Sequence, residues 1–371
     1  MLQTTQHRIS IRLKALRESN GLTQDALARA MGFKHRQIIA SIEAGERAIS
    51  ADELVRAAKA LRVDMDVLTD SFRLVGEGRF SFRAEGVPAA TLDQFEDRAG
   101  RWIATFRTLQ SEAGIQPSRL GQKLELTATA SFEDAHAAAE QIRQEWSLGD
   151  RPAETLRDAV ERALGVQVLF VDAPSGLSGA AVQLPGLNTI LINRRESEGR
   201  RHFDLAHELF HVLTWDAMAP ERVEPREPRP GKGNRVERLA DNFAGALLMP
   251  EHTVATYWAV RREGEDIHDW LNAAATALHV SAVALKWRVV ILGHVSKAAA
   301  EALDESRLAN NGGLVQDTAP LPFNRPFVGR VYHAVEDGRL SLRKAVDLLG
   351  LGVDAFSRLC GAYNLELSYE V

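Results

Sequence analysis

The apolar residues of the first 70 positions recur at the spacing of short helices. Ile9, Leu13 and Leu16 lie three or four residues apart, and Asn20-Gly21 supplies residues that tolerate the left-handed geometry of a helix end. Thr23 is suited to cap the next helix. The helices expected after the first span 24–30, about 34–44 and about 52–61. This pattern predicts a small all-α domain.

The pattern changes after residue 70. Phe80 and Phe82 alternate with polar residues, which predicts one short strand in a glycine-rich stretch. Helical periodicity returns from about 92 to 146, with a break near 114–117. The elements expected next are a helix at about 153–164 and strands at 166–170, 179–184 and 188–193. Helices and a few strands therefore share the middle of the chain.

Helices dominate the remainder, interrupted by a Pro-, Glu- and Arg-rich stretch at 219–235. The expected helices span Arg235–Leu248, 328–335, 342–349 and 353–363. The predicted fold class is multidomain and mainly α with a small β-sheet. The predicted division is an all-α domain at 1–72, a linker and helical connector at 73–150, an α+β domain at 151–295 and a helical C-terminal module at 320–371.

Composition narrows the class of protein. The chain has 371 residues, of which 45% are hydrophobic and 26% charged, as in globular proteins large enough for several domains. It has no run of about 20 apolar residues and no apolar signal-peptide core near its start. Its one cysteine, Cys360, excludes an internal disulfide and is expected to be a buried thiol. We therefore expect a cytoplasmic protein with no membrane partner.

Charge is distributed unevenly along the chain. Residues 1–62 hold 11 Lys/Arg and 6 Asp/Glu, a net charge of +5, whereas the whole chain has a net charge of −5. A basic first domain on an acidic body suggests that only this domain meets a polyanion. The alternative is that the uneven charge arose by chance, since the difference in net charge is small.

The segment His202–Trp215, HFDLAHELFHVLTW, carries an H-E-x-x-H motif. On a helix, His207 and His211 lie one turn apart on one face, close enough to bind one zinc ion together. Glu208 lies beside them, where it can act as general base on a water bound to the metal. The alternative is an ordinary helix that carries these residues by chance, and zinc also requires a third protein ligand.

That third ligand has one candidate in the next helix. A metzincin would carry Gly at 214 and His at 217, but the chain has Thr214 and Ala217. Glu237 and Asp241 instead stand one turn apart in RVERLADNFAGALL. Glu237 can complete a His-His-Glu zinc site, and Asp241 can orient a ligand histidine. The alternative for Glu237 is a solvated charge paired with a neighbouring arginine.

Together these motifs resemble the ImmA/IrrE metallopeptidases. RRHFDLAHELFHVL is followed about 25 residues later by ERLADNFAGALLMP, which is similar to that family's second motif at Glu237, Ala240, Asp241, Phe243 and Leu247 through Pro250. The resemblance implies a gluzincin-like zinc endopeptidase domain over about 150–295. It implies Zn²⁺ as cofactor, with His207, His211 and Glu237 as ligands and Glu208 as the catalytic residue.

The first domain resembles a second family. The pattern of Gly21-Leu22-Thr23-Gln24 with Leu27-Ala28, Met31-Gly32 and Ile42-Glu43-x-Gly45 is similar to the XRE/Cro-type helix-turn-helix. In such domains one helix crosses the phosphate backbone and the next lies in the major groove. The DNA-contacting residues expected on this basis are Gln24, Lys34, His35, Arg36, Gln37 and Ser41.

Their roles follow from their places in the motif. Arg36 or Gln37 is expected to read base edges, while Gln24 and Lys34 are expected to meet phosphates. The alternative is a helical domain that docks on protein instead of DNA. If it binds DNA, we expect a homodimer on an operator, because such domains bind paired half-sites.

The sequence thus favours a DNA-binding transcriptional regulator fused to a zinc endopeptidase. The resemblance implies a protein substrate, such as a helix-turn-helix repressor, in a stress, defence or mobile-element circuit. One alternative is a non-proteolytic repressor or antitoxin whose peptidase-like domain senses a ligand or holds a partner. The other is a stand-alone protease whose first domain recognises a repressor by pairing with it.

Overall fold

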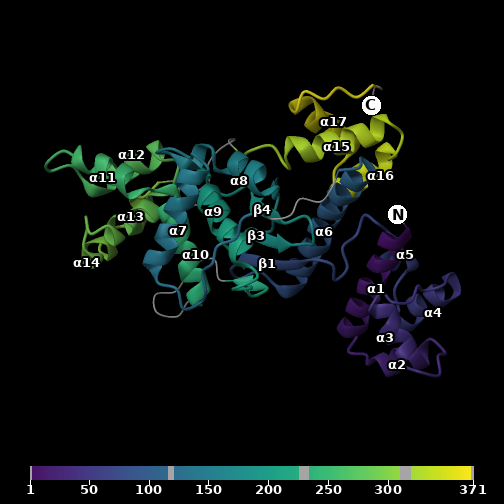
Figure 1. Cartoon of the computed structure of the whole chain (residues 1–371). Coiled ribbons are helices and arrows are strands. Elements are labelled where there is room, and N and C mark those ends of the chain that lie inside the picture. The colour runs from purple at the N-terminus through teal and green to yellow at the C-terminus, as the bar shows by residue number, and fades with distance from the viewer. Residues whose placement is uncertain (1, 116–120, 225–233, 310–318, 369–371) are drawn as a thin grey trace. The chain divides into compact units, whose positions relative to one another are not determined.

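The computed structural model describes residues 2–115, 121–224, 234–309 and 319–368. The chain divides into two compact units, each built from segments far apart in the sequence. Unit 1 comprises Met1–Arg79, Asp93–Gln116 and Gly329–Val371, and unit 2 comprises Phe80–Leu92 and Pro117–Val328. The predicted fold class is confirmed, because many helices accompany one small sheet (Figure 1). The expected division into continuous domains along the chain stays a prediction, since each of these two units combines segments that lie far apart in the sequence.

Unit 1 begins with the expected all-α domain. Its helices are α1 (Leu2–Ser19), α2 (Gln24–Ala30), α3 (Gln37–Glu43), α4 (Ala51–Leu61) and α5 (Met65–Thr69). Leu13, Leu27 and Ile39 are fully buried in one apolar core between these helices. Thr23 caps α2 as predicted, since its hydroxyl oxygen accepts a hydrogen bond from the Ala26 amide at 3.1 Å.

The third helix differs from its prediction. It was expected from about Lys34, but α3 begins at Gln37, with Arg36 in the N-cap position. Gly32 has a φ of +77°, and the Phe33 amide donates to the Ala28 carbonyl at 2.8 Å, so the chain turns sharply after α2. Lys34 and His35 therefore belong to the turn before the helix.

The rest of unit 1 joins the C-terminal residues to the connector. Its helices are most of α6 (Ala89–Glu112), most of α15 (Arg325–Glu336), α16 (Leu342–Leu349) and α17 (Val353–Ala362). The indole nitrogen of Trp102 on α6 donates to the Leu349 carbonyl at 3.3 Å. Cys360 is fully buried in α17, which confirms the expected buried thiol.

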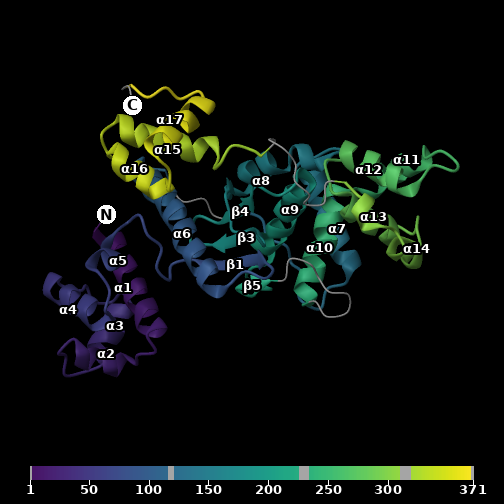
Figure 2. The same cartoon turned by 180° about the vertical axis from the view of Figure 1, so that it is seen from behind.

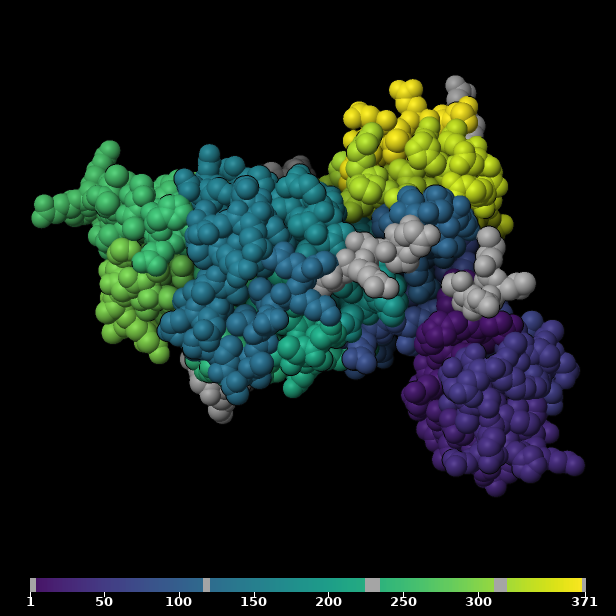
Figure 3. All heavy atoms as spheres, viewed as in Figure 1, coloured from purple at the N-terminus to yellow at the C-terminus, as the bar shows by residue number. Residues whose placement is uncertain are grey.

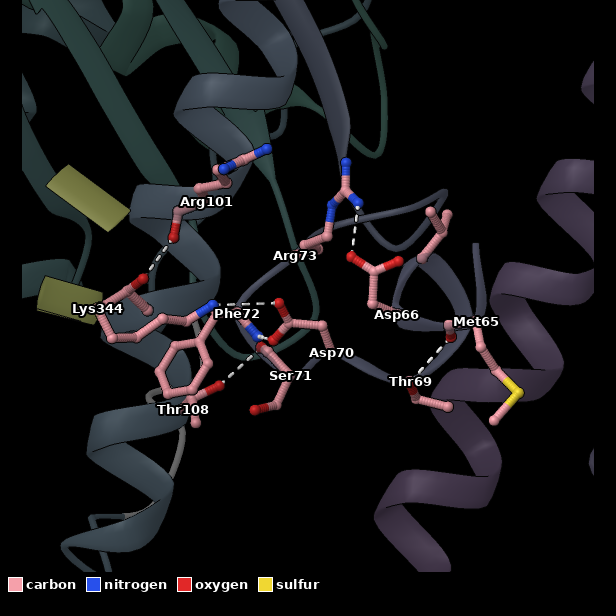
Figure 4. A network of polar contacts seen from close by, with 12 residues as sticks. Met65, Asp66, Thr69, Asp70, Ser71, Phe72, Arg73, Arg101, Thr108 and Lys344 are labelled. Atoms are coloured by element: carbon pink, nitrogen blue, oxygen red, sulfur yellow. Dashed lines mark hydrogen bonds and ion pairs between the residues drawn. The ribbon is translucent and has the colours of Figure 1, made fainter. Parts of the chain in front are cut away.

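A hydrogen bond and an ion pair join the segment after α5 to α6 and α16 (Figure 4). The Thr108 hydroxyl donates to the Ser71 carbonyl at 2.8 Å, and the Lys344 ammonium lies 3.6 Å from the Asp70 carboxylate. Arg12 of α1, only 1% exposed, donates to the carbonyls of Val67, Asp70 and Arg73. Buried polar contacts therefore hold this segment in place within unit 1.

Unit 2 contains a five-stranded sheet in the order β2-β4-β3-β1-β5. The strands are β1 (Arg79–Ala84), β2 (Gln167–Val171), β3 (Leu177–Gln183), β4 (Thr189–Asn193) and β5 (Val223–Glu224). β4 runs parallel to β2 and antiparallel to β3, and β5 runs parallel to β1 at one edge (Figure 2). The predicted strands are confirmed within about two residues, including the strand inferred from Phe80 and Phe82.

The other elements described in unit 2 are helices. They are α7 (Phe132–Glu145), η1 (Pro152–Glu154), α8 (Leu156–Leu164), α9 (Glu198–Thr214), α10 (Arg235–Leu248), α11 (Glu251–Ala259), α12 (Ile267–Ala277), α13 (Ala282–Ile291), α14 (Lys297–Glu301) and η2 (Glu305–Arg307). On the sheet, α8 packs against β2 and α9 packs against β3 and β4, and α10 packs on α9 and α7. The rings of Phe210 on α9 and Phe243 on α10 lie 5.4 Å apart between these helices. Atoms of the segment that carries α7 form much of the near surface of unit 2 in Figure 3.

Helical periodicity predicts more helix before α7 than the described residues contain. The expected helix from 92 to 146 with one break is instead the two helices α6 and α7, and the described residues between them, 113–115 and 121–131, are not helical. Among these residues, the Leu124 amide donates to the Leu213 carbonyl at 3.0 Å, and the Arg235 guanidinium donates to the Ala128 carbonyl at 2.9 Å. These tertiary contacts satisfy backbone groups without a helix. Ser131 then starts α7 with a capping box to Asp134.

In the described part of the chain, no single helix has the length and apolarity to cross a membrane. One helix pair, Ile267–Ala277 with Ala282–Ile291, meets the length and composition criteria together but is bent by 104°.

Candidate metal centre and nucleic-acid interface

Helix α9 presents the H-E-x-x-H residues to the interior of unit 2. His207 and His211 lie one turn apart, and each is only 1% exposed. Gly199 in the first turn lets the helix approach its neighbours closely, because a Cβ there would lie 2.3 Å from the Val280 carbonyl carbon. The start of α9 is thus fixed against the turn before α13.

Glu237 of α10 completes a three-residue cluster with the two histidines. Its carboxylate lies 3.1 Å from the Nε2 atom of His207 and 3.2 Å from the Nε2 atom of His211. The two Nε2 atoms lie 3.0 Å apart, and the potential ligand atoms all lie within 4.8 Å of one another. The residues predicted as metal ligands therefore meet at one point.

The donor set suits a zinc ion. Nitrogen and oxygen ligands about 2.0–2.1 Å from a tetrahedral zinc lie about 3.3 Å from each other, close to the separations found here. The two Nε2 atoms lie in contact with each other, which leaves room for a proton on only one of them, whereas a cation can accept a lone pair from both and from the carboxylate. A bound cation would satisfy them together, so the cluster can hold a metal.

Glu208 lies beside this cluster and under the sheet. It is 1% exposed, and its Oε2 atom has no hydrogen-bond partner among the described residues. A Cβ at Gly179 of β3 would lie 3.3 Å from the Glu208 Oε1 atom. The glycine therefore leaves room for the carboxylate against the strand.

The pKa values of the site reflect burial among opposed charges. Burial raises the pKa of Glu208 to about 8, despite the opposing charges of His207 and Arg83. Burial and Arg83 act to lower the pKa of His207, but Glu237 and Asp241 outweigh them and raise it to about 9. Burial would raise the pKa of Glu237, yet the histidines hold it well below its usual range. Glu237 is thus ionised while Glu208 readily holds a proton.

Asp241 lies where the sequence prediction placed it, one turn after Glu237. Its Oδ1 atom accepts from the Nδ1 atom of His207 at 2.9 Å. This bond keeps a proton on Nδ1 of His207, so that Nε2 is the nitrogen that can lose its proton and bind a metal. Burial would raise the pKa of Asp241, but Arg83 and His207 lower it, so the carboxylate is ionised.

Arg83 is a residue of this site that sequence reasoning missed. Its guanidinium lies 3.2 Å from Asp241 and 3.4 Å from Asp204 of α9, and it is only 4% exposed. In β1 the apolar residues Phe80 and Phe82 alternate with Ser81 and Arg83, a pattern typical of a strand with one face in solvent. Only the packing of β1 into the sheet beside α9 buries Arg83, so no local signal identified it.

Most of the residues predicted to contact DNA lie in the turn before α3 and at the start of α3. Lys34, His35, Arg36 and Gln37 are exposed, and Ser41 is half-buried on α3. The structure thus leaves the first four side chains available to a ligand, and their DNA contacts stay a prediction.

Gln24 has a second role in the fold. It is half-buried at the start of α2, and its side-chain amide donates to the Glu43 carboxylate at 2.9 Å. Glu43 also accepts from the Arg17 guanidinium at 2.6 Å. Gln24 therefore helps fix α2 against α3, while its predicted phosphate contact stays untested.

Comparison with protein families agrees with both resemblances. Residues 13–68 match the helix-turn-helix family, and residues 161–289 match the IrrE N-terminal-like domain. The predicted fusion is confirmed: the chain joins a helix-turn-helix segment to an IrrE-like peptidase domain. The second match includes His207, Glu208, His211, Glu237 and Asp241, whereas Arg83 lies outside it.

Comparison with individual proteins adds little. No curated protein sequence matches the chain. A solved structure, the apo form of the competence regulator ComR from Streptococcus vestibularis, aligns with 13% identity over 97% of this chain and 99% of that chain. Its TM-score of 0.17 is too low to support an argument about fold or function.

Proposed function

From a helix-turn-helix segment joined to an IrrE-like peptidase domain, we propose a DNA-binding transcriptional regulator that is also a zinc-dependent endopeptidase. The observation that carries this proposal is the convergence of His207, His211 and Glu237 beside Glu208. Its substrate would be a regulatory protein, such as a helix-turn-helix repressor in a stress, defence or mobile-element circuit. A role on DNA implies action in the cytoplasm.

The residues of the site have distinct parts in this proposal. His207, His211 and Glu237 would hold a zinc ion, which supplies Lewis-acid polarisation of the scissile carbonyl and activation of water. Glu208 would accept a proton from the attacking water and pass it to the leaving amine. A divalent cation beside Glu208 would lower the pKa that burial raises in the metal-free protein, which favours the ionised form that accepts a proton.

The helix-turn-helix would bring the peptidase to an operator. Arg36 and Gln37 would read base edges, and Lys34 would contribute attraction to phosphates. We propose that two chains bind as a homodimer, because helix-turn-helix domains read paired half-sites. The exposure of these residues and the positive charge of residues 1–62 support this assignment.

A second function is favoured by one observation. The ligand cluster and Glu208 are all 1–2% exposed, so a polypeptide reaches them only after some part of unit 2 moves. A peptidase-like domain that senses a ligand or holds a partner, in a repressor or antitoxin, needs no such access. This alternative shares the DNA-binding proposal but predicts no cleavage.

One experiment separates the two functions. Cells producing the wild-type chain or the Glu208→Gln variant would be compared for protein N-termini that arise only with the wild type. Candidate substrates would then be incubated with purified full-length protein and zinc. We expect one or a few regulatory proteins to be cut at a defined bond by the wild type alone. Identical N-termini in both cells, together with intact purified candidates, would favour the sensing function.

A further inference from the structure

Strand β1 contributes a side chain to the metal centre from outside the IrrE-like domain. Arg83 lies in this strand, and residues 161–289 alone match that domain. β1 is held in the sheet between β3 and β5, and the Ser178 hydroxyl of β3 donates to the Arg83 carbonyl at 3.2 Å. The backbone of Arg83 is thus fixed independently of its guanidinium.

A continuous chain of contacts runs from Arg83 to the metal cluster. Both terminal guanidinium nitrogens lie 3.2 Å from the Oδ1 atom of Asp241. The same oxygen accepts from His207 Nδ1 at 2.9 Å, and the opposite ring nitrogen of His207 faces Glu237. Asp241 therefore has one oxygen shared between the arginine and the histidine.

We propose that Arg83 is a positioning residue of the metal centre, which fixes the His207 ring for the metal through Asp241. This inference rests on the proposed function, since it concerns the same zinc site. Without Arg83, the partly exposed Asp241 carboxylate would lose its charged partner, and the acceptor for His207 would be free to turn. Metal affinity then depends on the position of β1 in the sheet as well as on the IrrE-like domain.

The segment Phe80–Leu92, which contains most of β1, lies in the sequence between two segments of unit 1. The chain enters Phe80–Leu92 from residues of unit 1 and returns to unit 1 at Asp93. The residue that positions His207 therefore belongs to a segment bounded on both sides by residues of the unit that contains the helix-turn-helix.

A double-mutant cycle on the full-length chain tests the proposal. Zinc affinity would be measured by competition with a chromophoric chelator for wild type, Arg83→Met, Asp241→Asn and the double variant. Loss of a group that orients a metal ligand typically lowers metal affinity about 10- to 100-fold. We expect each single variant to lose affinity in this range, and the double variant to bind no more weakly than Asp241→Asn.

Further variants separate positioning from general packing. Arg83→Lys keeps the charge but loses the paired nitrogens, so it should recover part of the affinity. Arg201→Met is the matched control, because Arg201 is also a buried arginine of unit 2 but donates to the carbonyls of Arg194 and Glu196. The absorption spectrum of bound Co²⁺ should change in Arg83→Met and Asp241→Asn but not in Arg201→Met. Circular dichroism would establish that each metal-free variant is folded.

The outcomes are distinguishable. Wild-type zinc affinity in Arg83→Met, or additive losses in the double variant, would overturn the positioning role. If Arg83→Met does not fold, the cycle with Arg83→Lys decides by the same criterion. A wild-type chain that binds no zinc would instead refute the proposed function, on which this inference rests.

Discussion

The Nε2 atoms of His207 and His211 lie 3.0 Å apart, and both face the Glu237 carboxylate. Two ring nitrogens at this separation leave room for at most one proton between them. A divalent cation shared by the three side chains replaces these competing contacts with coordinate bonds.

We therefore predict one zinc ion per chain. Elemental analysis of the purified full-length protein should give a zinc-to-protein ratio near one. His211→Ala should reduce this ratio sharply, because it removes one of three ligands. His252→Ala is the control, since His252 is exposed and contacts Asp150 instead. A wild-type protein that stays metal-free after zinc is offered would refute the ligand assignment.

Replacing Glu208 by Gln should separate metal binding from catalysis. The amide keeps the shape of the side chain but cannot accept a proton, so the cleavage rate should fall about 10²–10⁴-fold. The zinc content should be unchanged, because Glu208 is not among the ligands. Glu251→Gln, at an exposed position in α11, is the control. Equal cleavage of an identified substrate by wild type and Glu208→Gln would show that another group is the base.

The stability of the metal-free protein should fall as the pH rises above neutrality. The pKa values of His207, about 9, and Glu208, about 8, exceed their ordinary values of 6.5 and 4.5. Groups with raised pKa values stabilise the fold fully below their ordinary pKa and lose that contribution as the pH passes the folded-state value. The contribution of His207 is thus lost between about pH 6.5 and 9.

Zinc should reverse this trend, because it displaces the proton from His207. The difference in melting temperature between zinc-loaded and metal-free protein should therefore grow over the same pH interval. Thermal melts with zinc or with a chelator measure it. The increase should be smaller in Glu208→Gln, which lacks one titrating group. A difference that shrinks with rising pH would contradict the assignment of the proton to His207.

Substitutions in the turn before α3 and at its start should affect DNA binding in two ways. Arg36→Ala or Gln37→Ala should cost about 1–3 kcal/mol on the cognate duplex and little on scrambled DNA. Lys34→Ala should weaken binding to both duplexes and reduce the slope of the salt dependence by about one. The cognate duplex would be selected from random sequences with the full-length chain.

Gel-shift titrations at two salt concentrations measure these effects, with Lys59→Ala as control at an exposed position of α4. If the full-length chain binds neither duplex at low salt, the helix-turn-helix segment docks on protein instead of DNA.

Cys360 should be unreactive in the folded protein. It is fully buried, and burial together with the charge of Glu336 raises the pKa of its thiol to about 11. Because the thiolate is the reactive form, a thiol reagent near about pH 8 should react slowly with native protein and rapidly with denatured protein. Fast reaction under native conditions would place Cys360 at the surface.

The sequence alone identified the chemistry of the candidate metal centre. An i, i+4 histidine pair and a second motif with Glu237 are local patterns, because a helix converts spacing directly into position on a face. The same is true of Thr23, whose capping role depends only on its immediate neighbours. Strands β2, β3 and β4 followed from short apolar runs, although their pairing order did not.

Tertiary structure decided everything that depends on distant segments. The start of α3 differs from its prediction for a local reason, because the backbone turn between Gly32 and α3 leaves no mark on the apolar periodicity. Before α7, the backbone groups of Leu124 and Ala128 form hydrogen bonds with Leu213 and Arg235, which lie far along the chain. Arg83 sits in a strand whose alternation predicts a solvent-facing arginine. Its burial beside Asp241, 158 residues away, follows only from the packing of β1 into the sheet. A local pattern specifies which face a side chain occupies, whereas only the assembled fold specifies what lies against that face.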